Sequence, residues 1–382
     1  MKQLIALVAL VAFTLPALAE DLTLGYIALE SDPRYDENFA YARIALRPQG
    51  DSFDGVKLAV EDMKILTDAK GLTVSLDEMR VRPETVASAG ERLVAEGIGY
   101  VIADLPAESI AVLADAVGGA ATILNTTAPE DSLRRACYRG LLHTAASDRM
   151  ISDALIQHLV RQEWTKVLLL HGKAERDTAR AESFAEAAKR MRVDIVDTRV
   201  FDLSTNPALR EENNIMLLTG GIRDYDVIVI ADEYGEYSRY VPFQTALPRP
   251  VVGATGLVPA EWHWALERYG APQVNSRFEA ETGRRMGWQD WSTWVAARAV
   301  LTAFAKARAP GTEGDFLRSE RLKLDGSKGV PMTFRPWNGQ LRMPILLATH
   351  NAIVDIAPIE GFMHQLNTLD TLGQDEAEFA CD

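Results

Sequence analysis

The chain has 382 residues, and its 54 acidic against 40 basic side chains give a formal net charge of −14 at pH 7. This acidity argues against nucleic acid and anionic membrane surfaces as partners and permits a cationic ligand, although a well-solvated exported surface explains it as well. The length exceeds what one compact core supports and predicts about two domains.

The N-terminus has the pattern of a secretory signal peptide over residues 1–19. Lys2 supplies the positive start, residues 4–15 the apolar core, and Ala17 to Ala19 the small-residue cleavage site. The core of about 12 residues is too short to cross a hydrocarbon layer of ~30 Å. No later segment approaches 18 uninterrupted apolar residues, so we expect an exported protein that is not inserted in a membrane.

Strands and helices alternate through the first part of the chain. An apolar run predicts a first strand over 22–29, a long polar loop follows over 30–50, and helical spacing of apolar residues marks 51–66. The next predicted elements are strand 72–79, helix 86–96, strand 100–103, helix 109–117 and strand 121–124. Such alternation predicts a doubly wound parallel sheet.

A second series of the same kind begins near Ser147. Its predicted elements are helix 150–162, strand 166–171, helix 174–191, strand 194–201, strand 227–231, a short helix near 237–243 and strand 250–253. A strong helix at 289–308 and hairpin-like strands at 334–341, 345–348 and 353–356 complete the chain. We therefore predict an α/β fold of two Rossmann-like doubly wound lobes with a hinge and a cleft between them. The expected lobes are 21–145 plus 274–325 and 146–273 plus 326–382.

The sequence contains two cysteines, Cys137 and Cys381. Export places them where disulfides persist, and an exposed thiol is a liability there, so a disulfide is favoured over two free thiols. The bridge would tie the C-terminal end to the end of the first half of the chain.

Carboxylates follow several of the predicted strands, where open α/β sheets bind their ligands. Asp104, Glu175, Asp232 and Glu233 are candidate ligands for a hard cation such as calcium or a lanthanide. The sequence has no contiguous Asp-x-Asp-x-Asp loop, so a metal site would be assembled from separate loops. A charged rim or helix capping is the simpler interpretation of the same residues.

The loop after the fifth strand carries Asn125, Thr126 and Thr127, whose hydroxyl and amide groups suit a carboxylate or another anion. The start of a capped helix is the alternative. Trp291 and Trp294 lie on one helical stripe with Trp288, which indicates core packing, or stacking of one ring on a flat ligand.

Catalytic motifs are absent from the sequence. It contains no Gly-x-Ser-x-Gly elbow, no His-Glu-x-x-His, no Walker A sequence and no pair of histidines at helical spacing. Because no nucleophile and base can be paired, we do not expect an enzyme.

Three segments carry a resemblance to a known family: 53–59 in the first helix, Thr127 to Glu130 after the fifth strand, and 251–256 in the second series. Together with the two α/β series they resemble the type I periplasmic binding proteins of ABC transporters, the branched-chain amino acid class. At a closer level 32–36, 335–342 and 369–373 look like the substrate-binding proteins associated with PQQ-dependent alcohol dehydrogenase systems.

This resemblance implies where a ligand would be held. Thr127 would supply a hydroxyl to a ligand carboxylate, with Asn125 nearby, and Thr255 stands where the family has the carboxylate that meets the ligand's ammonium. Arg176 and Glu233 replace aromatic cleft residues, which argues against an ordinary amino acid and suits a polar ligand of mixed charge or a metal complex. The other residues expected at the ligand are Tyr35, Asp104, Ser109, Thr126 and Asp232.

The resemblance also implies a function. It indicates a monomeric periplasmic component of an uptake system that delivers a small ligand or metal to a membrane permease and is linked to PQQ-dependent alcohol oxidation. The alternative is a periplasmic accessory or scaffold protein that has kept the fold without binding a small molecule.

Overall fold

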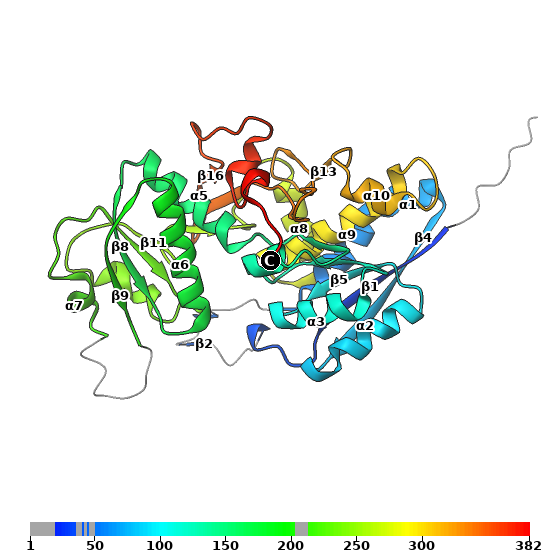
Figure 1. The fold of residues 1–382 in the computed structure, drawn as a ribbon, viewed down its shortest axis with the longest axis horizontal. Coiled ribbons are helices and arrows are strands. Elements are labelled where there is room, and N and C mark those ends of the chain that lie inside the picture. Colours follow the sequence, from blue (N-terminus) through cyan, green and yellow to red (C-terminus); the bar gives the residue numbers. More distant parts are fainter. Residues whose placement is uncertain (1–19, 36–39, 42–43, 46–49, 203–212) are drawn as a thin grey trace, which may run out of the picture.

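The computed structural model describes residues 20–35, 40–41, 44–45, 50–202 and 213–382. The described chain forms two lobes side by side, with the C-terminal segment at their junction (Figure 1). The predicted signal peptide lies outside the described residues. Within them, no helix is both long enough and apolar enough to cross a membrane.

Five parallel strands form the sheet of the first lobe in the order β4-β1-β5-β6-β7. They are β1 Glu20–Leu29, β4 Leu72–Val81, β5 Tyr100–Asp104, β6 Thr122–Asn125 and β7 Leu141–His143. Helices cover both faces, which is why the inner strands β5 and β6 are buried almost throughout, whereas the edge strand β4 alternates between buried and exposed residues. One face packs on α1 (Phe53–Lys70) and α9 (Trp288–Lys306), the other on α2 (Val86–Ala95) and α3 (Ala107–Val117).

Four parallel strands form the sheet of the second lobe in the order β11-β10-β8-β9. They are β8 Lys166–His171, β9 Asp194–Val200, β10 Val227–Ala231 and β11 Val251–Gly253. One face packs on α5 (Asp148–Arg161) and α6 (Glu175–Arg190). The other packs on α7 (Ile215–Thr219) and the 3-10 helix η5 (Ser238–Phe243).

The smaller elements complete the lobes. β12 (Val258–Ala260), β15 (Ile345–Thr349) and β16 (Ala352–Ala357) form an antiparallel sheet that contacts α5. α8 (Ala271–Thr282) packs on α1, and α10 (Glu313–Arg318) packs on α9. The remaining elements are η1 Pro33–Tyr35, β2 Ala40–Tyr41, β3 Ile44–Ala45, η3 Pro83–Thr85, α4 Asp131–Arg135, β13 Leu324–Asp325, β14 Pro331–Met332, η6 Thr368–Thr371 and η7 Glu376–Glu378.

These observations confirm the predicted fold of two doubly wound α/β lobes. The predicted disulfide is also present, with the Cα atoms of Cys137 and Cys381 5.7 Å apart. The short helix expected at 237–243 is a 3-10 helix that contains Pro242, and proline inside a helix removes a backbone donor. The exact lobe boundaries stay predictions.

The tryptophans of α9 belong to the core. Trp291 and Trp294 are fully buried, and Trp291 stacks on Trp262 with ring centroids 5.9 Å apart. Core packing is therefore the correct interpretation of this stripe at Trp291 and Trp294.

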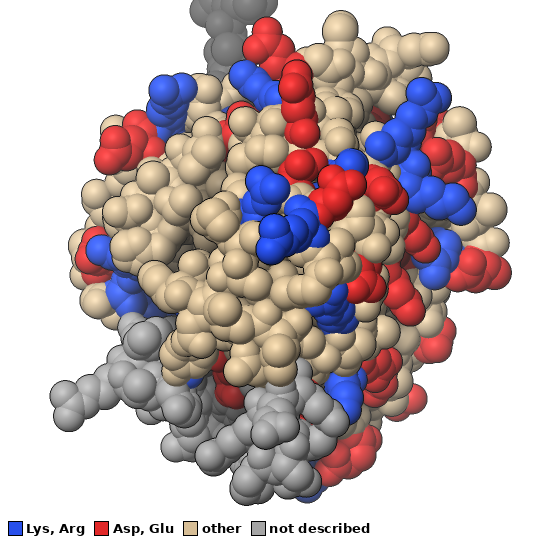
Figure 2. Space-filling model, turned by 90° about the vertical axis from the view of Figure 1, so that its left-hand side faces the viewer, with Lys and Arg blue, Asp and Glu red and all other residues tan. Residues whose placement is uncertain are grey.

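The outer end of the second lobe carries both charged and exposed apolar side chains. Figure 2 shows basic and acidic side chains interspersed with uncharged ones on this face. α7, at the left-hand end in Figure 1, exposes Met216 by 55% and Leu217 by 66%.

Candidate functional site

Each sheet has one point at which its strand order reverses. In the first lobe β1 lies between β4 and β5, so the order reverses between β1 and β5; in the second lobe it reverses between β8 and β10. Ligands of open α/β sheets bind outside the carboxyl ends of the strands at this position. Asp104 ends β5, η1 follows β1, His171 ends β8 and Asp232 follows β10. These loops define the candidate site.

Asp104 is the centre of the first lobe's half of the site. Its side chain is 1% exposed. It accepts hydrogen bonds from the Ser52 and Tyr35 hydroxyls at 2.5 Å each, and from the Thr127 hydroxyl at 2.8 Å. Arg34 donates to it from Nη2 at 2.9 Å. Three predicted residues, Tyr35, Asp104 and Thr127, are thus brought together.

The surroundings of Asp104 favour its charged form. Burial alone would raise the pKa of Asp104, but the Arg34 charge and the hydroxyl donors outweigh it and lower that pKa below its usual value. Burial and the neighbouring Asp104 charge raise the pKa of the Tyr35 phenol well above its usual value, so Tyr35 stays a donor. The group is therefore a buried carboxylate held by neutral donors and one guanidinium.

The loop after β6 is organised by its own side chains. Asn125 Oδ1 accepts the Ala128 N–H at 2.9 Å, and its Nδ2 donates to the Ala128 carbonyl at 2.8 Å. The Thr126 hydroxyl donates to the Ala103 carbonyl at 2.9 Å. Asn125 and Thr126 therefore position Thr127. Of these three side chains, that of Thr127 is the one that hydrogen-bonds to Asp104.

Arg176, near the start of α6, is the centre of the second lobe's half of the site. It makes a two-pronged ion pair with Asp148 at 2.9 and 3.0 Å and approaches Glu130, from the loop after β6, at 3.3 Å. Glu233 Oε2 lies 4.0 Å away. Since Glu130 follows a strand of the first sheet and Arg176 a strand of the second, the carboxyl ends of the two sheets meet here. Burial would lower the pKa of Arg176, but the Asp148 carboxylate raises it.

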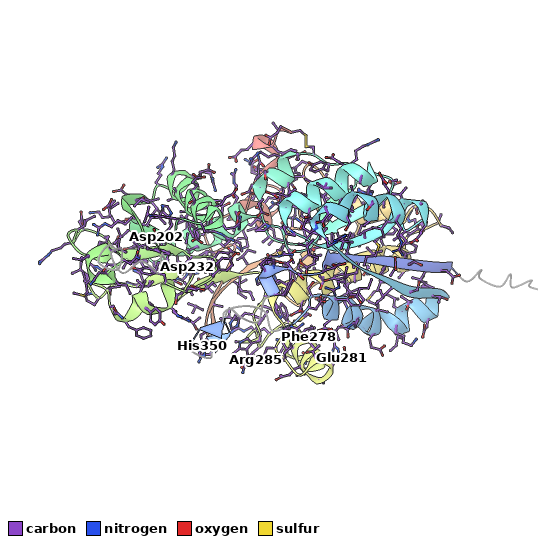
Figure 3. The ribbon with its side chains drawn as sticks, turned by 90° about the horizontal axis from the view of Figure 1, so that it is seen from below. Asp202, Asp232, Phe278, Glu281, Arg285 and His350 are labelled. Carbon is purple, nitrogen blue, oxygen red and sulfur yellow. A yellow bond between two sulfur atoms is a disulfide. The ribbon has the colours of Figure 1, made fainter. Side chains whose placement is uncertain are left out.

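Asp232 and Glu233 differ in role although they are adjacent. Both oxygens of Asp232 accept backbone N–H groups of its own loop, from Gly235, Tyr237 and Ser238 at 2.8 to 3.1 Å. Figure 3 shows Asp232 among the green elements of the second lobe. Glu233 is 39% exposed, and its backbone N–H donates to the Asp177 carboxylate at 2.7 Å. The Glu233 carboxylate is thus accessible to a ligand, whereas the Asp232 carboxylate holds the backbone of its loop in place.

The remaining predicted residues lie around this centre. Ser109 is buried in the first turn of α3, Thr255 is half-buried in the loop after β11, and Glu175 is exposed at the first position of α6. Among the described residues no group of three or more histidine, cysteine or carboxylate side chains could hold a metal ion. The metal role of Asp104, Glu175, Asp232 and Glu233 stays a prediction.

Three residues of the site were not expected from the sequence: Arg34, Ser52 and Asp148 take part in the contacts above as ion pairs or donors. Glu130 and Arg34 were within segments singled out by the sequence, but no local pattern shows their partners. Ser52 stands at the N-cap position of α1, but its hydroxyl donates to Asp104, and Asp51 accepts the Phe53 N–H.

The fold is that of the type I periplasmic binding proteins. A scan against protein-family models and a search of curated proteins give no match. Among solved structures, an ABC transporter substrate-binding protein from Sphaerobacter thermophilus aligns with a TM-score of 0.70 at 14% identity, over 88% of this chain and 98% of that one.

Two further solved structures give the same result. A branched-chain amino acid ABC transporter periplasmic ligand-binding protein from Burkholderia xenovorans aligns with a TM-score of 0.69 at 15% identity, over 88% of this chain and 95% of that one. A substrate-binding protein from Desulfitobacterium hafniense in complex with Leu aligns with a TM-score of 0.65 at 16% identity, over 87% and 98%. At these identities the likeness shows a shared fold.

Proposed function

We propose that this chain is the periplasmic solute-binding component of an ABC-type uptake system and binds a small polar ligand between its lobes. The observation that supports this most directly is that the carboxyl ends of the two sheets meet where Arg176 of the second lobe reaches Glu130, in the loop after β6 of the first, at 3.3 Å. A ligand in this position contacts both lobes, and only a ligand that does so can favour a closed form over an open one.

The fold neighbours support the cellular setting of this proposal. Proteins with this fold are described as ABC transporter substrate-binding and periplasmic ligand-binding proteins. We accordingly propose a periplasmic monomer that hands its ligand to a membrane permease. The closer resemblance carried by 335–342 and 369–373 supports a link to PQQ-dependent alcohol oxidation.

The site's chemistry argues against a simple aliphatic amino acid. Thr127, the expected partner of a ligand carboxylate, is bonded to Asp104, a carboxylate of the chain itself. Arg176 and Glu233 place charges where an apolar side chain would need an apolar wall. A polar, charged ligand or a metal complex fits these groups better.

A thermal-shift panel tests the proposal. The disulfide-intact protein would be mixed with amines, small acids, alcohols, pyrroloquinoline quinone, and calcium or lanthanide salts. A ligand at 100 times its dissociation constant adds about 2.7 kcal/mol of stability, which is a clear shift. We expect a shift with at least one compound and its reduction by Glu233→Gln; Asp232 is unsuitable for this test because its loop depends on it.

The second candidate is an accessory protein that docks on a partner. The exposed Met216 and Leu217 of α7 favour it, because exposed apolar side chains that lie together mark interaction surfaces. Absence of any shift across the panel would contradict the solute-binding proposal and favour this one.

A further inference from the structure

The first lobe's half of the site already holds a cation. The guanidinium of Arg34 donates from Nη2 to Asp104 at 2.9 Å and from Nε to Asp32 at 2.9 and 3.0 Å. It lies on η1, directly after β1, at the strand-order reversal where a ligand is expected. The group found in the ligand's position is therefore an organic cation belonging to the chain.

The two partners of this ion pair are very differently fixed. The Asp104 side chain is 1% exposed and is held by four hydroxyl donors, of which Tyr26 is the most distant at 3.4 Å. The Arg34 side chain is 30% exposed and is held besides by Asp32. Asp104 would stay hydrogen-bonded if Arg34 moved away, since Ser52, Tyr35 and Thr127 would remain. A ligand cation can exchange with Arg34 only if the Asp104 carboxylate keeps its position without Arg34, and the hydroxyl donors hold it there.

The charge of the whole site points the same way. Seven carboxylates lie in it against four guanidinium groups; the carboxylates are Asp32, Asp104, Glu130, Asp148, Asp177, Asp232 and Glu233, and the guanidinium groups are those of Arg34, Arg134, Arg176 and Arg180. Such an excess of negative charge attracts cations and repels anions. A ligand carboxylate bound to the Thr127 hydroxyl would lie next to the Asp104 carboxylate and be repelled by it.

We propose that the ligand carries a guanidinium or ammonium group that replaces Arg34 on Asp104, and that Arg34 is the site's own occupant in the ligand-free protein. The inference rests on the proposed solute-binding function and names its ligand class, an organic cation. Arg34 then acts as an internal competitor that weakens binding of ligands too small to reach both Asp104 and the second lobe.

The test is a calorimetric titration of the intact chain with two probes of opposite charge. Agmatine carries a guanidinium and an ammonium group without a carboxylate, and succinate carries two carboxylates. We expect agmatine to bind the wild type, to bind Arg34→Gln at least tenfold more tightly because the competitor is gone, and to bind Asp104→Asn at least tenfold more weakly. Arg92→Gln is the matched control, since Arg92 pairs with Glu96 on the outer helix α2, and it should bind agmatine as the wild type does.

A second readout follows the ligand's effect on Arg34 in the wild type itself. In the wild type the side-chain Nε–H signal of Arg34, assigned from its loss in Arg34→Gln, should shift on addition of agmatine as the guanidinium leaves Asp104. Two results would overturn the inference: failure of agmatine to bind both the wild type and Arg34→Gln, or succinate binding that Arg34→Gln abolishes. In the second case the solute-binding function would stand, and Arg34 would bind an anionic ligand. If no compound of the thermal-shift panel bound, the solute-binding function itself would be contradicted.

Discussion

Single residues show that the most distinctive sequence segments of the C-terminal third are structural. Asp370 Oδ1 accepts from Arg335 Nε at 2.7 Å and from Arg342 Nε at 2.9 Å, and all three side chains are buried. Arg335 also donates to the carbonyls of Leu369 and Leu372. The segments 335–342 and 369–373, which carry the closer resemblance, therefore meet in one buried ion cluster.

This cluster gives a prediction about stability. Asp370→Asn removes the ion-pair partner of buried Arg335 and leaves buried Arg342 only Glu320, at 3.1 Å. Breaking a buried ion pair from one side costs about 3–5 kcal/mol. Urea denaturation should show a loss of this order. Asp224→Asn is the matched control because the Asp224 side chain is 81% exposed beside Lys166, and it should cost less than about 1 kcal/mol. Equal losses in both variants would contradict the structural role of the cluster.

The sequence predicted some residues of the site but not their contacts. Asp104 and Thr127 stood out because Asp104 is the last residue of an apolar strand and Thr127 lies two residues beyond the end of another, and that position in a parallel sheet is fixed by local pattern. Their mutual hydrogen bond depends on the pairing of β5 with β6, and the contact of Arg34 depends on the path of the loop after β1. Such contacts arise from tertiary packing, which no short sequence pattern encodes.

At the scale of elements, the predicted lobe boundaries place three crossovers within the described residues. They run from β7 to α5, from β12 to α8 and from β13 towards β15. Glu261 of the second segment accepts the Ala146 N–H of the first at 2.9 Å. Lys328 of the third donates to the Pro344 carbonyl at 3.0 Å and lies 3.8 Å from the centroid of the Trp291 ring. A buried carboxyl and a buried amine thus lie where the lobes join.

Both groups titrate far from their usual range. Burial raises the pKa of Glu261 to about 8, although Lys328, the Ala146 N–H, Arg134 and Arg180 oppose the rise. Burial likewise lowers the pKa of Lys328 to about 7, against the opposing effect of the Glu261 charge. The Oε2 atom of Glu261 has no hydrogen-bond partner, which fits a neutral carboxyl.

The sign of the resulting pH dependence follows from proton binding. An unfolded glutamate loses its proton near pH 4.5, whereas native Glu261 keeps it to about pH 8. The native state therefore binds more protons in this window, and Glu261 makes the free energy of unfolding fall as the pH rises from 5 to 8. Glu261→Gln removes this contribution while the amide oxygen can still accept the Ala146 N–H.

Urea denaturation at two pH values measures the effect. Relative to the wild type, Glu261→Gln should gain at least about 1 kcal/mol between pH 5 and pH 8, since one pKa unit corresponds to about 1.4 kcal/mol. Glu84→Gln is the control, because the Glu84 side chain is 64% exposed, and its difference from the wild type should not change with pH. A gain that is the same at both pH values would show that burial does not hold Glu261 neutral.

Secondary structure was predictable where local pattern decides it. β5, β8 and β10 are apolar runs buried on both faces, and the sequence showed each within a residue or two. α8 was not predicted, because its buried face has only Ala271, Val274 and Phe278 and its other residues are polar. Its helical state depends on packing against α1, which lies far away in the sequence.

At the scale of the whole molecule, the connections between the two lobes allow a hinge motion but restrict its range. The connecting segments lie together at Glu261, and the disulfide holds the C-terminal end to the segment after α4. The ion pairs of Arg176 cross from the second lobe to Glu130 at the opposite side of the site. Ligand binding there would add contacts between the lobes, so a closed form would gain stability over an open one.

The most direct test of a solute-binding function is small-angle X-ray scattering of the intact chain with saturating agmatine, or with the panel compound that gives the largest thermal shift. We expect a smaller radius of gyration with the ligand than without it, and no change in Asp104→Asn at the same concentration. An unchanged radius of gyration in the wild type, at a concentration where the thermal shift is complete, would contradict ligand-induced closure between the lobes.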